Sequence, residues 1–509
     1  MERPPEFCDV VVIGGGPAGA TAASLLAREG FSCVILEKDR FPRYHIGESL
    51  LPSLHPMLDL IGVGEKVRSY GFVVKVAGFF HIKKDLPPGK VDFRKNIDYK
   101  YSYQVIRSEF DHLLLQHARG LGALVYEETI ATQVEFDETG TARAVCWQGQ
   151  GEGRIGCRFV IDASGQSGIL ASRQLGTRVY QEEFANVALG SYYKGHRPYV
   201  DAAGEAHPGS FVMEAFHDGS GWTWAIPLHD GSLSVGVVLH RDTHRAWHDE
   251  LGNNEKVYQR CLDLCPVMVG MLAPAERYAP IRVWSDYSYM ASQFAGTGWR
   301  LAGDAAGFID PLFSSGVHLA MLGGLVAAAS IGASIRGDTT EAEAGSLHDA
   351  LLRRAYTRWM IAVAGFYRQI RSQERMVLPG VDAASFHRAF EAVEPLFFGS
   401  LEAGVEEVPE AALRAAMDLG GKIWMEVYNV PTGSGLAKFM GRVMPDKNFD
   451  IDLRALDGWV LRLKPGSLGM ERQSVLAAAG ASLGKVLARS LLMVVSRFDS
   501  ATQSDGRAG

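Results

Sequence analysis

The most informative chemistry in this chain lies in a glycine-rich turn near its N-terminus. Gly14, Gly16 and Gly19 fit the spacing G-x-G-x-x-G, with Ala18 inside it. Glycine at these positions permits a tight turn, a close approach of backbone to a pyrophosphate, and close packing of a helix on a strand. A helix that begins at such a turn presents free amides and a positive dipole end to phosphate oxygens. The turn therefore predicts a dinucleotide site.

An acidic residue follows the turn at a distance suited to binding a ribose. Glu37 lies 18 residues after Gly19, at the end of an apolar segment. A carboxylate there can accept hydrogen bonds from ribose hydroxyls. The glycine spacing alone is weak evidence, but strand, turn, helix, second strand and acid occur in the expected order. Further candidate cofactor contacts follow at Lys38, Arg43 and Ser49.

Two other groups of residues could do chemistry. Lys75 stands inside an apolar segment, where a buried charge is costly unless it is paired or used. A lysine on the exposed face of a strand is the simpler interpretation, and the nearby Lys83 and Lys84 are expected to be solvated. Trp222 and Trp224, two residues apart, would share one face of a strand, and cross-strand packing is the usual explanation of such a pair.

The elements that position these residues follow from the apolar pattern. Strand patterns stand at 9–13, 33–36, 72–82, 102–106, 123–126 and 159–162, and helical patterns at 20–28, 108–119 and 315–336. Between about 180 and 290 apolar and polar residues alternate, as in Ser232–Leu239. That alternation predicts an antiparallel sheet with one face covered. Beyond residue 340 the pattern is mostly helical.

Composition argues against several functions. The 509 residues include 51 Lys and Arg against 58 Asp and Glu, a net charge of −7, which does not favour nucleic-acid binding. Six scattered cysteines fit a reducing compartment, and the one close pair, Cys261 and Cys265, lacks the further ligands of a zinc site. We find no signal-peptide pattern and no uninterrupted apolar run of roughly 18 residues. A cytoplasmic protein with no membrane span is therefore expected; Ser482–Phe498 is interrupted by charges and reads as an amphipathic helix.

Two later segments resemble FAD-specific elements of flavin monooxygenases. Gly303-Asp304 ends an apolar run ahead of a helix, like the second FAD motif of those enzymes, whose Asp holds the ribityl chain. The pattern V-x-R-x-x-F-D from Val105 to Asp111 is similar to a stretch whose arginine, here Arg107, lies near the flavin. Asp304 alone could be a helix N-cap, but with the glycine turn it indicates FAD. We see no second glycine-rich turn of this kind for NAD(P)H, so a separate NAD(P)H flavin reductase would supply the reduced flavin as FADH2.

One motif narrows the resemblance to a single family. Trp222, Trp224, Ile226 and Pro227 form W-x-W-x-I-P, the signature of flavin-dependent halogenases. Wider segments look like the fungal halogenases of phenolic polyketides, of the radicicol and griseofulvin pathway type, and the resemblance runs from about residue 8 to 375. These segments are Arg43–Ser53, Asp310–Gly316 and Lys464–Gly469. The resemblance implies an α/β fold: an FAD-binding Rossmann-like (GR2-type) flavin monooxygenase scaffold with an antiparallel-sheet substrate region and a helical C-terminal region.

The family resemblance also implies a role for each candidate residue. Reduced FAD and O2 would give a flavin hydroperoxide that oxidises chloride or bromide to a hypohalous acid such as HOCl. Trp222 and Trp224 would line the flavin side of a tunnel, with the two residues that complete their motif, and keep the organic substrate from the flavin. The amides of Ser315 and Gly316 would hold the halide at a helix start, with Gly316 also near FAD. Lys75 would polarise the hypochlorous acid through a hydrogen bond, or form a chloramine.

One departure from a related pattern concerns the substrate. Tryptophan halogenases carry Glu before the Ser-Thr-Gly of their halide loop, where this chain has Phe313. That favours a phenol, whose ortho and para carbons are electron-rich, over tryptophan. A free phenol and a carrier-protein-tethered phenol both fit the pattern. His318 and His81 are candidate bases, but each is more often a structural histidine.

Three other functions share parts of this pattern. A single-component aromatic hydroxylase usually carries an Asp-Gly pair where this chain has Asp162-Ala163. An FAD-dependent reductase of isoprenoid lipids shares the scaffold but does not need W-x-W-x-I-P together with Lys75. A non-catalytic flavin-binding protein needs neither the tryptophans nor the halide loop. The joint pattern therefore favours a halogenase.

We expect two intertwined parts in the chain. Residues 1–375 would form the FAD-binding halogenase core, with the sheet region of about 180–290 inserted into it. Residues 376–509 would form a mostly helical region that covers the substrate site, ending in a disordered tail at about 500–509.

Overall fold

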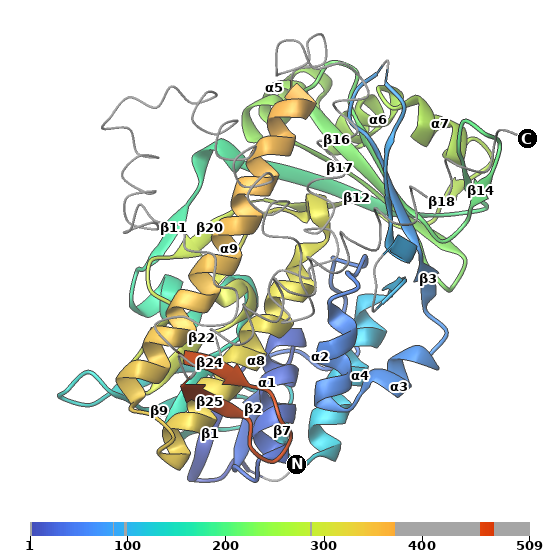
Figure 1. Ribbon diagram of the computed structural model, residues 1–509. Helices are drawn as coiled ribbons and strands as arrows, with labels where there is room; N and C mark the ends of the chain where they lie inside the picture. Colours follow the sequence, from blue (N-terminus) through green and yellow to red (C-terminus); the bar gives the residue numbers. More distant parts are fainter. Residues whose placement is uncertain (1–2, 85, 96–98, 286–287, 372–458, 473–509) are drawn as a thin grey trace, which may run out of the picture.

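Two β-sheets, one above the other in Figure 1, form the framework of the protein. The computed structural model describes residues 3–84, 86–95, 99–285, 288–371 and 459–472. The lower sheet carries the glycine-rich turn, and the upper sheet carries the tryptophan motif. The predicted α/β fold is confirmed.

The lower sheet is built on parallel strands. Five of them run in the order β7-β2-β1-β10-β22. They are β1 (Phe7–Ile13), β2 (Cys33–Leu36), β7 (Leu124–Tyr126), β10 (Glu152–Asp162) and β22 (Trp299–Leu301). Three more pair antiparallel: β8 (Ile130–Phe136), β9 (Ala142–Gln148) and β21 (Ala295–Gly296). The inner strand β1 has Val, Ile and Cys buried on both faces, as parallel strands require. The predicted strands of this region are confirmed.

Long helices cover the parallel sheet. α1 (Pro17–Arg28) packs against α4 (Arg107–Gly120) and α8 (Ser315–Arg336), and these three helices confirm the predicted ones. Close contact between α1 and α8 depends on glycine, because a side chain on Gly324 would overlap with the carbonyl of Ala18. α9 (Glu341–Arg371) packs against α8 and reaches both sheets, at β21 and at β16 (Gly221–Pro227) (Figure 1).

The upper sheet follows the order β18-β12-β17-β16-β15-β4-β5 and is antiparallel except for the pair β4 and β15. Its other strands are β4 (Ala77–His81), β5 (Gly89–Asp92), β12 (Asn186–Lys194), β15 (Phe211–Ala215), β17 (Ser232–His240), β18 (Glu276–Arg277) and β19 (Arg282–Trp284), which pairs with β12. The predicted antiparallel strands between 180 and 290 are present, and two strands from before residue 100 extend their sheet.

The expectation that only one face of this sheet is covered was wrong. Every residue of β16 is buried, as are residues 232–239 of β17. Val235 and Val237 face a core completed by α6, whereas Trp222 and Trp224 face the larger core shared with the FAD-binding part. Alternation in β17 arises because Ser and Gly occupy the face that the tryptophans cover.

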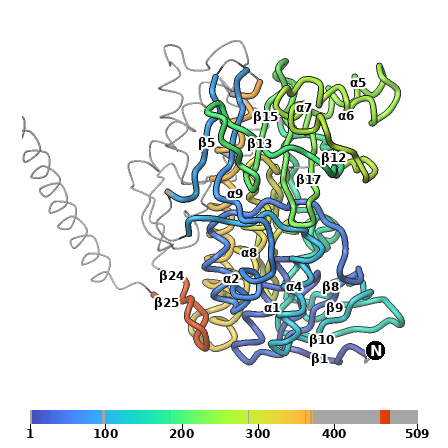
Figure 2. Tube along the Cα trace, turned by 90° about the vertical axis from the view of Figure 1, so that its right-hand side faces the viewer, coloured from blue at the N-terminus to red at the C-terminus, as the bar shows by residue number. Residues whose placement is uncertain are grey.

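Three helices between 240 and 275 were not expected from the alternation. They are α5 (Arg241–Leu251), α6 (Asn254–Asp263) and α7 (Pro266–Leu272). Their outward faces are charged, and α6 begins at a sequence-readable cap, where Asn253 Oδ1 accepts a hydrogen bond from the amide of Lys256 at 2.9 Å. These helices cover the second face of the upper sheet (Figure 2).

Smaller elements complete the described chain. They are α2 (Leu54–Ile61), α3 (Gly64–Arg68), β3 (Val73–Lys75) with β6 (Ser102–Gln104), β11 (Arg178–Tyr180) with β20 (Tyr289–Ala291) and β23 (Gly307–Phe308), and β13 (Tyr199–Val200) with β14 (Ala206–His207). The segment 459–472 forms a hairpin of β24 (Trp459–Arg462) and β25 (Gly469–Arg472) against α8, so the helical prediction was wrong there. The rest of 376–509, including the predicted amphipathic helix and tail, lies outside the described residues.

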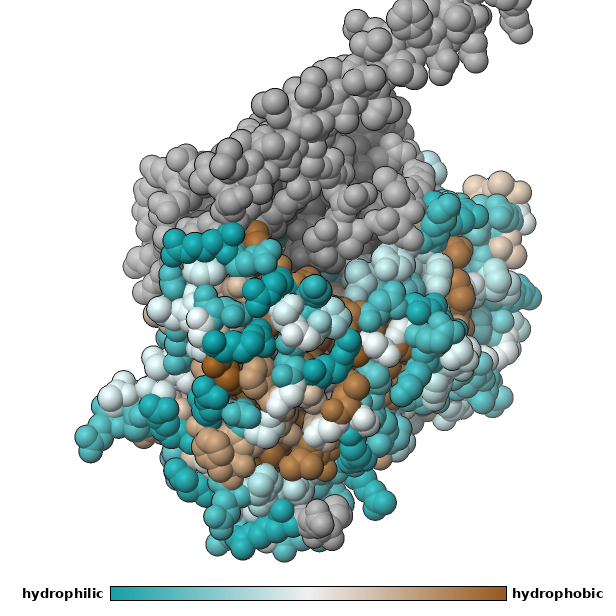
Figure 3. Space-filling model, turned by 60° about the horizontal axis from the view of Figure 1, so that its bottom comes forward, coloured by the Kyte–Doolittle hydropathy of each residue, from teal (hydrophilic) through white to brown (hydrophobic). Residues whose placement is uncertain are grey.

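One helix among the described residues, α8, is long and apolar enough to cross a membrane by length and composition. In this fold 94% of its most apolar window is buried inside the protein, between α1 and α9. The face of the molecule in Figure 3, by contrast, has hydrophilic side chains interspersed with small apolar patches. Core packing in a folded domain accounts for the composition of α8.

Candidate functional site

The glycine-rich turn is closed by backbone contacts on two sides and open on a third. Gly14 has a φ of +103°, and a side chain there would overlap with the carbonyl of Ala163. A side chain on Gly19 would overlap with the carbonyl of Gly14. At Gly16 the nearest atom to an added Cβ would be Arg43 Nη2, at 3.5 Å. The turn therefore leaves room beside Gly16 and the first amides of α1, where a pyrophosphate could bind.

Glu37 directly follows β2, and its carboxylate turns back to the glycine turn. Its Oε2 accepts a hydrogen bond from the amide of Gly15 at 2.6 Å, and its Oε1 from the amide of Asp39 at 2.8 Å. Burial raises the pKa of Glu37, while these amides and the charge of Arg43 oppose the rise. Each oxygen keeps a lone pair for a ribose hydroxyl. Lys38, in contrast, has an exposed side chain.

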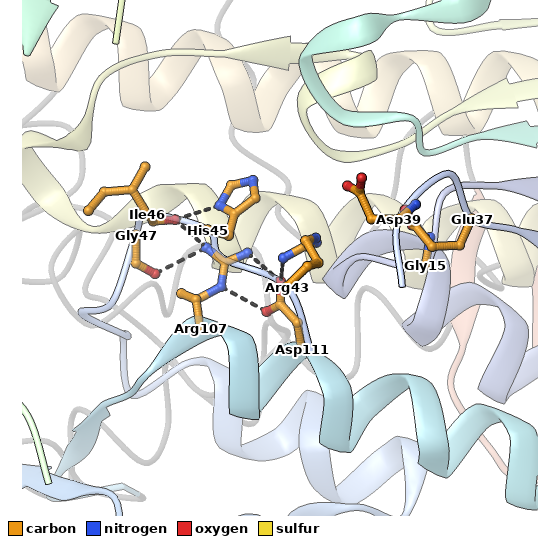
Figure 4. Close-up of polar contacts among 9 residues, drawn as sticks. All are labelled: Gly15, Glu37, Asp39, Arg43, His45, Ile46, Gly47, Arg107 and Asp111. Atoms are coloured by element: carbon orange, nitrogen blue, oxygen red, sulfur yellow. Dashed lines mark hydrogen bonds and ion pairs between the residues drawn. The ribbon is translucent and has the colours of Figure 1, made fainter. Parts of the chain in front are cut away.

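Two arginines next to the turn are fixed by one buried carboxylate (Figure 4). Asp111 accepts from Arg107 Nε and Nη2 at 2.8 and 2.9 Å, and from Arg43 Nη1 at 2.8 Å. Burial alone would raise the pKa of Asp111, but Arg107, with Arg43, holds it below its usual range. Arg107 Nη1 also donates to the carbonyls of Ile46 and Gly47. The pair is therefore held in place before any ligand binds.

The second predicted FAD motif, which contains Asp304, lies next to the first at the start of α1. Gly303 has a φ of +62°, and an added Cβ there would lie 3.0 Å from the Cβ of Ala18. No described residue donates a hydrogen bond to the carboxylate of Asp304, whose pKa is raised to about 6 by burial, against the charges of Arg107 and Arg178. A half-buried acceptor to which no described residue donates suits a hydroxyl of a ligand. The donor and acceptor set of this site therefore fits FAD.

Lys75 ends β3 and is buried, with 3% of its surface exposed. Its Nζ donates to Ser49 Oγ at 2.8 Å and to the carbonyl of Leu50 at 3.1 Å. In the part of the chain that the structure describes, no carboxylate forms an ion pair with it. Burial lowers the pKa of Lys75 to about 7. The exposed-lysine interpretation was wrong, and Ser49, predicted as a cofactor contact, is a partner of this lysine.

Aromatic rings lead from Lys75 toward the start of α8. Lys75 Nζ lies 5.0 Å from the ring centroid of Phe93 and 5.4 Å from that of Phe211. Phe80 stands next, 5.6 Å from Phe211 and 6.4 Å from Phe313, centroid to centroid. Phe313 is buried and immediately precedes the two serines that lead into α8. Buried aromatic rings in contact therefore connect the surroundings of Lys75 with the start of α8.

The two tryptophans lie side by side on β16, with ring centroids 6.1 Å apart. Trp224 rests on glycine, since a side chain on Gly236 would overlap with its indole and one on Gly190 would lie 3.3 Å from it. These two glycines face each other across β12 and β17. Trp224 Nε1 donates to Ser234 Oγ at 3.3 Å. The two glycines thus leave room for the indole of Trp224 to pack against the backbone of the sheet. Ile226 and Pro227 are buried at the end of the same strand.

The amides at the start of α8 have no hydrogen-bond acceptor among the described residues. Ser314 has a φ of +59° and makes no side-chain capping hydrogen bond, and no described residue accepts from the amides of Ser315 and Gly316. An added Cβ on Gly316 would find only Phe308, at 3.7 Å. The first turn of α8 can therefore receive a small anion.

Two predicted bases have protein partners. His318 is buried, with Nδ1 2.8 Å from Ser53 Oγ, and His81 Nε2 lies 3.0 Å from Tyr199 Oη. Burial also lowers the pKa of His81 to about 4. Each histidine thus has the hydrogen-bond partner that the structural interpretation expects. Lys83, expected to be solvated, is instead buried, and burial lowers its pKa to about 8.

Sequence reasoning missed a polar cluster beside the tryptophans. Tyr367 Oη accepts from Trp222 Nε1 at 2.9 Å and from Asn186 Nδ2 at 2.8 Å, and it donates to Asp310 Oδ2 at 2.8 Å. These residues come from α9, β16, β12 and the segment before α8, so no spacing along the chain joins them. The only signal was an aspartate before proline in Asp310-Pro311, which is typical of a turn.

The chain is similar over most of its length to several known proteins. The family model described as "FAD binding domain" matches residues 7–355. The flavin-dependent halogenase armH3 of Armillaria mellea is 38% identical over 501 residues, covering 92% of this chain and 98% of that protein. The sulochrin halogenase gedL of Aspergillus terreus is 36% identical, covering 92% and 94%. The structure of the myxobacterial chondrochloren halogenase CndH, an FAD-dependent halogenase, superposes with a TM-score of 0.67 at 33% identity, covering 82% of this chain and 97% of that one.

Proposed function

This chain belongs to the flavin-dependent halogenases, FAD-dependent oxidoreductases that use a halide and O2, and we propose that it halogenates an electron-rich phenol through a hypohalous acid. The observation that carries the proposal is Lys75. It is a buried amine without an acidic partner among the described residues, beside aromatic rings that extend toward the start of α8. A protein keeps such a costly group when the group is used.

The cofactor is held by residues from distant parts of the chain. Glu37 accepts from ribose hydroxyls, Arg43 and the turn amides meet the pyrophosphate, and Asp304 and Arg107 hold the ribityl chain and the flavin end. When reduced FAD is bound, it supplies with O2 the oxidising equivalents that convert chloride or bromide to hypohalous acid. Asp111 fixes both arginines beforehand, so binding does not have to order them.

The halide is held by the amides of Ser315 and Gly316. Free amides and the helix dipole stabilise a small anion without a lysine or arginine. Trp222 and Trp224 separate the organic substrate from the flavin, because two large, buried rings held side by side on β16 occupy the space between them. Hypochlorous acid is small enough to travel toward Lys75.

Lys75 acts on hypochlorous acid. Two of the three N–H groups of its ammonium donate to Ser49 and Leu50, and the third donates to the oxygen of hypochlorous acid. The Cl–O bond breaks as the ring carbon bonds to chlorine, and the ring proton and hydroxide leave as water. In its amine form Lys75 can instead take up chlorine as a chloramine, releasing water, before passing it to the ring.

The substrate we propose is a phenol, either free or tethered to a carrier protein. Its hydroxyl already donates electrons to the ring, and the aromatic surroundings of Lys75 can bind a planar ring. Phe313 occupies the position where an indole-specific site carries Glu, which supports the phenol. A separate NAD(P)H flavin reductase is the proposed source of FADH2, and the cytoplasm the proposed location.

The proposal is tested by supplying reduced FAD through a generic reductase, with chloride or bromide, O2 and a panel of phenols. Mass spectrometry should find halogen isotope patterns in the wild type, while Lys75→Ala oxidises the flavin without halogenating. Lys90→Ala is the control, because Lys90 Nζ also lies on a ring, Phe79, at 5.4 Å, but on the opposite face of the sheet. Hydroxylated product from the wild type, or normal halogenation by Lys75→Ala, would refute the proposal.

A further inference from the structure

The hydroxyl of Tyr367 joins three buried side chains from three other parts of the fold. It accepts from Trp222 on β16 and from Asn186 on β12, and donates to Asp310, which precedes α8. One O–H donor and two acceptor lone pairs are all in use, so the group is saturated. Another buried tyrosine, Tyr356, donates instead to the backbone carbonyl of Gly303. Tyr367 is therefore a junction between side chains.

Asp310 carries the junction to the start of α8. While its Oδ2 accepts from Tyr367 and Asn186, its Oδ1 accepts from the amide of Leu312 at 3.0 Å. That last bond fixes the single turn Pro311–Phe313, after which Ser314 takes a positive φ and α8 begins. The carboxylate thus sets the path of the halide loop, which we define as residues 310–316.

The two ends of this network belong to the tunnel wall and to the halide loop. We propose that Tyr367 is a positioning residue that holds Trp222 and the halide loop in register through Asp310. This inference rests on the proposed function, because it takes the amides of Ser315 and Gly316 as the halide site. Its physical basis is that loss of the hydroxyl leaves Trp222 Nε1, Asn186 and Asp310 each short of a partner in a buried place.

After loss of the Tyr367 hydroxyl, the part of the network whose movement costs the least free energy shifts to restore hydrogen bonds. A buried polar group without a partner costs more than the net gain of one hydrogen bond, so the side chains rearrange to find new partners. Asp310 is the terminal residue of a short turn, whereas Trp222 is fixed in the middle of a sheet. The halide loop is therefore the part that shifts, and the amides that face the anion shift with it.

The test uses the holoenzyme with oxidised FAD and titrates bromide, following the change in flavin absorbance. Tyr367→Phe should weaken bromide binding by about tenfold, with FAD affinity within about twofold of the wild type. Tyr258→Phe is the matched control, since it removes a buried tyrosine hydroxyl on the far side of the upper sheet. Bromide affinity equal in the two variants would overturn the inference, as would a wild type that binds no bromide.

A second variant keeps the test decisive if Tyr367→Phe folds poorly. Trp222→Phe removes the indole N–H from the same junction and should weaken bromide binding several-fold. In the double variant the loss should be no larger than in Tyr367→Phe alone, because residues acting through one network are not additive. A Trp222→Phe chain that binds bromide as tightly as Tyr258→Phe would overturn the inference without any Tyr367 variant, and where both variants fold, additive losses would show that Trp222 and the halide loop are independent. A wild type that binds bromide but halogenates no phenol would refute the proposed function and leave this test intact.

Discussion

At the scale of single residues, Lys75 shows how a costly group is kept in this fold. Two neutral oxygens, Ser49 Oγ and the Leu50 carbonyl, accept its hydrogen bonds, and two aromatic faces lie near its ammonium. Neither compensates fully for the water that burial removes, which is why the pKa of Lys75 is lowered to about 7. The residue therefore changes charge near neutral pH, where a surface lysine would not.

Replacing Lys75 by Met should stabilise the protein most at acid pH. The pKa of Lys75 is lowered from 10.5 to about 7 on folding, so its contribution to stability is present above 10.5 and lost as the pH falls through 7. The variant has no such loss. Urea unfolding at pH 6 and pH 9 measures the difference in free energy of unfolding between the two chains, which should be larger at pH 6. Equal differences at both pH values would contradict the lowered pKa.

The sequence allowed Lys75, the glycine turn and the tryptophan motif to be predicted because each is a local pattern. It did not allow the Tyr367 junction to be predicted, since Asn186, Asp310 and Tyr367 are far apart in the chain and each is common in other settings. The burial of Lys83 was missed for a similar reason, because tertiary packing, and not the neighbouring residues, decides whether a lysine just after a strand is exposed to water. Ser49 was assigned to the cofactor from its motif, although its hydroxyl meets Lys75.

At the scale of elements, β17 explains a wrong prediction. Its residues Ser232, Ser234 and Gly236 alternate with valine and leucine, and the pattern reads as a solvated face. The side chains on this face are small because the indole of Trp224 packs on them, not because the face is exposed to solvent. Alternation thus predicted the strand correctly and its surroundings incorrectly, and the covering helices α5, α6 and α7 were missed with them. In the parallel strands β1 and β2, which are buried on both faces, nearly every residue is apolar, so their sequence does not suggest a solvated face.

The glycine seat of Trp224 can be tested on its own strand. Gly236→Ala places a methyl group where the indole lies, so Trp224 must shift, and we expect the free energy of unfolding to fall by about 1–3 kcal/mol. Indole fluorescence should change as well. Gly270→Ala is the control, since nothing lies within 4 Å of an added Cβ at that position of α7. If Gly236→Ala is as stable as the wild type and its fluorescence is unchanged, the indole of Trp224 does not pack closely on Gly236.

At the scale of the whole molecule, the proposed FAD contacts come from segments that the chain order keeps apart. Glu37 and Arg43 lie early, Arg107 begins α4, and Asp304 follows β22. A single ligand that touches all of them ties the parallel sheet, its helices and the segment before α8 together. Binding to the folded state alone stabilises that state by mass action.

Removal of FAD should therefore lower the thermal unfolding temperature. FAD at a hundred times its dissociation constant adds about 2.7 kcal/mol to the free energy of unfolding, so the apo chain should melt several degrees lower. Adding FAD should restore the higher temperature in the wild type. In Glu37→Ala the same FAD concentration should give a smaller shift, because a ribose contact is lost. Equal increases of the unfolding temperature in the wild type and in Glu37→Ala would show that Glu37 does not contact FAD.

The composition of α8 has a consequence for how the protein is made. This helix could pass for a membrane span, and its burial depends on α1, which is synthesised before it, and on α9, which follows it. Until α9 has left the ribosome, one side of a very apolar helix is uncovered. Folding of the nascent chain therefore has a vulnerable interval that begins after residue 336 and lasts at least until α9 ends at residue 371, in which aggregation or capture by a chaperone competes with docking.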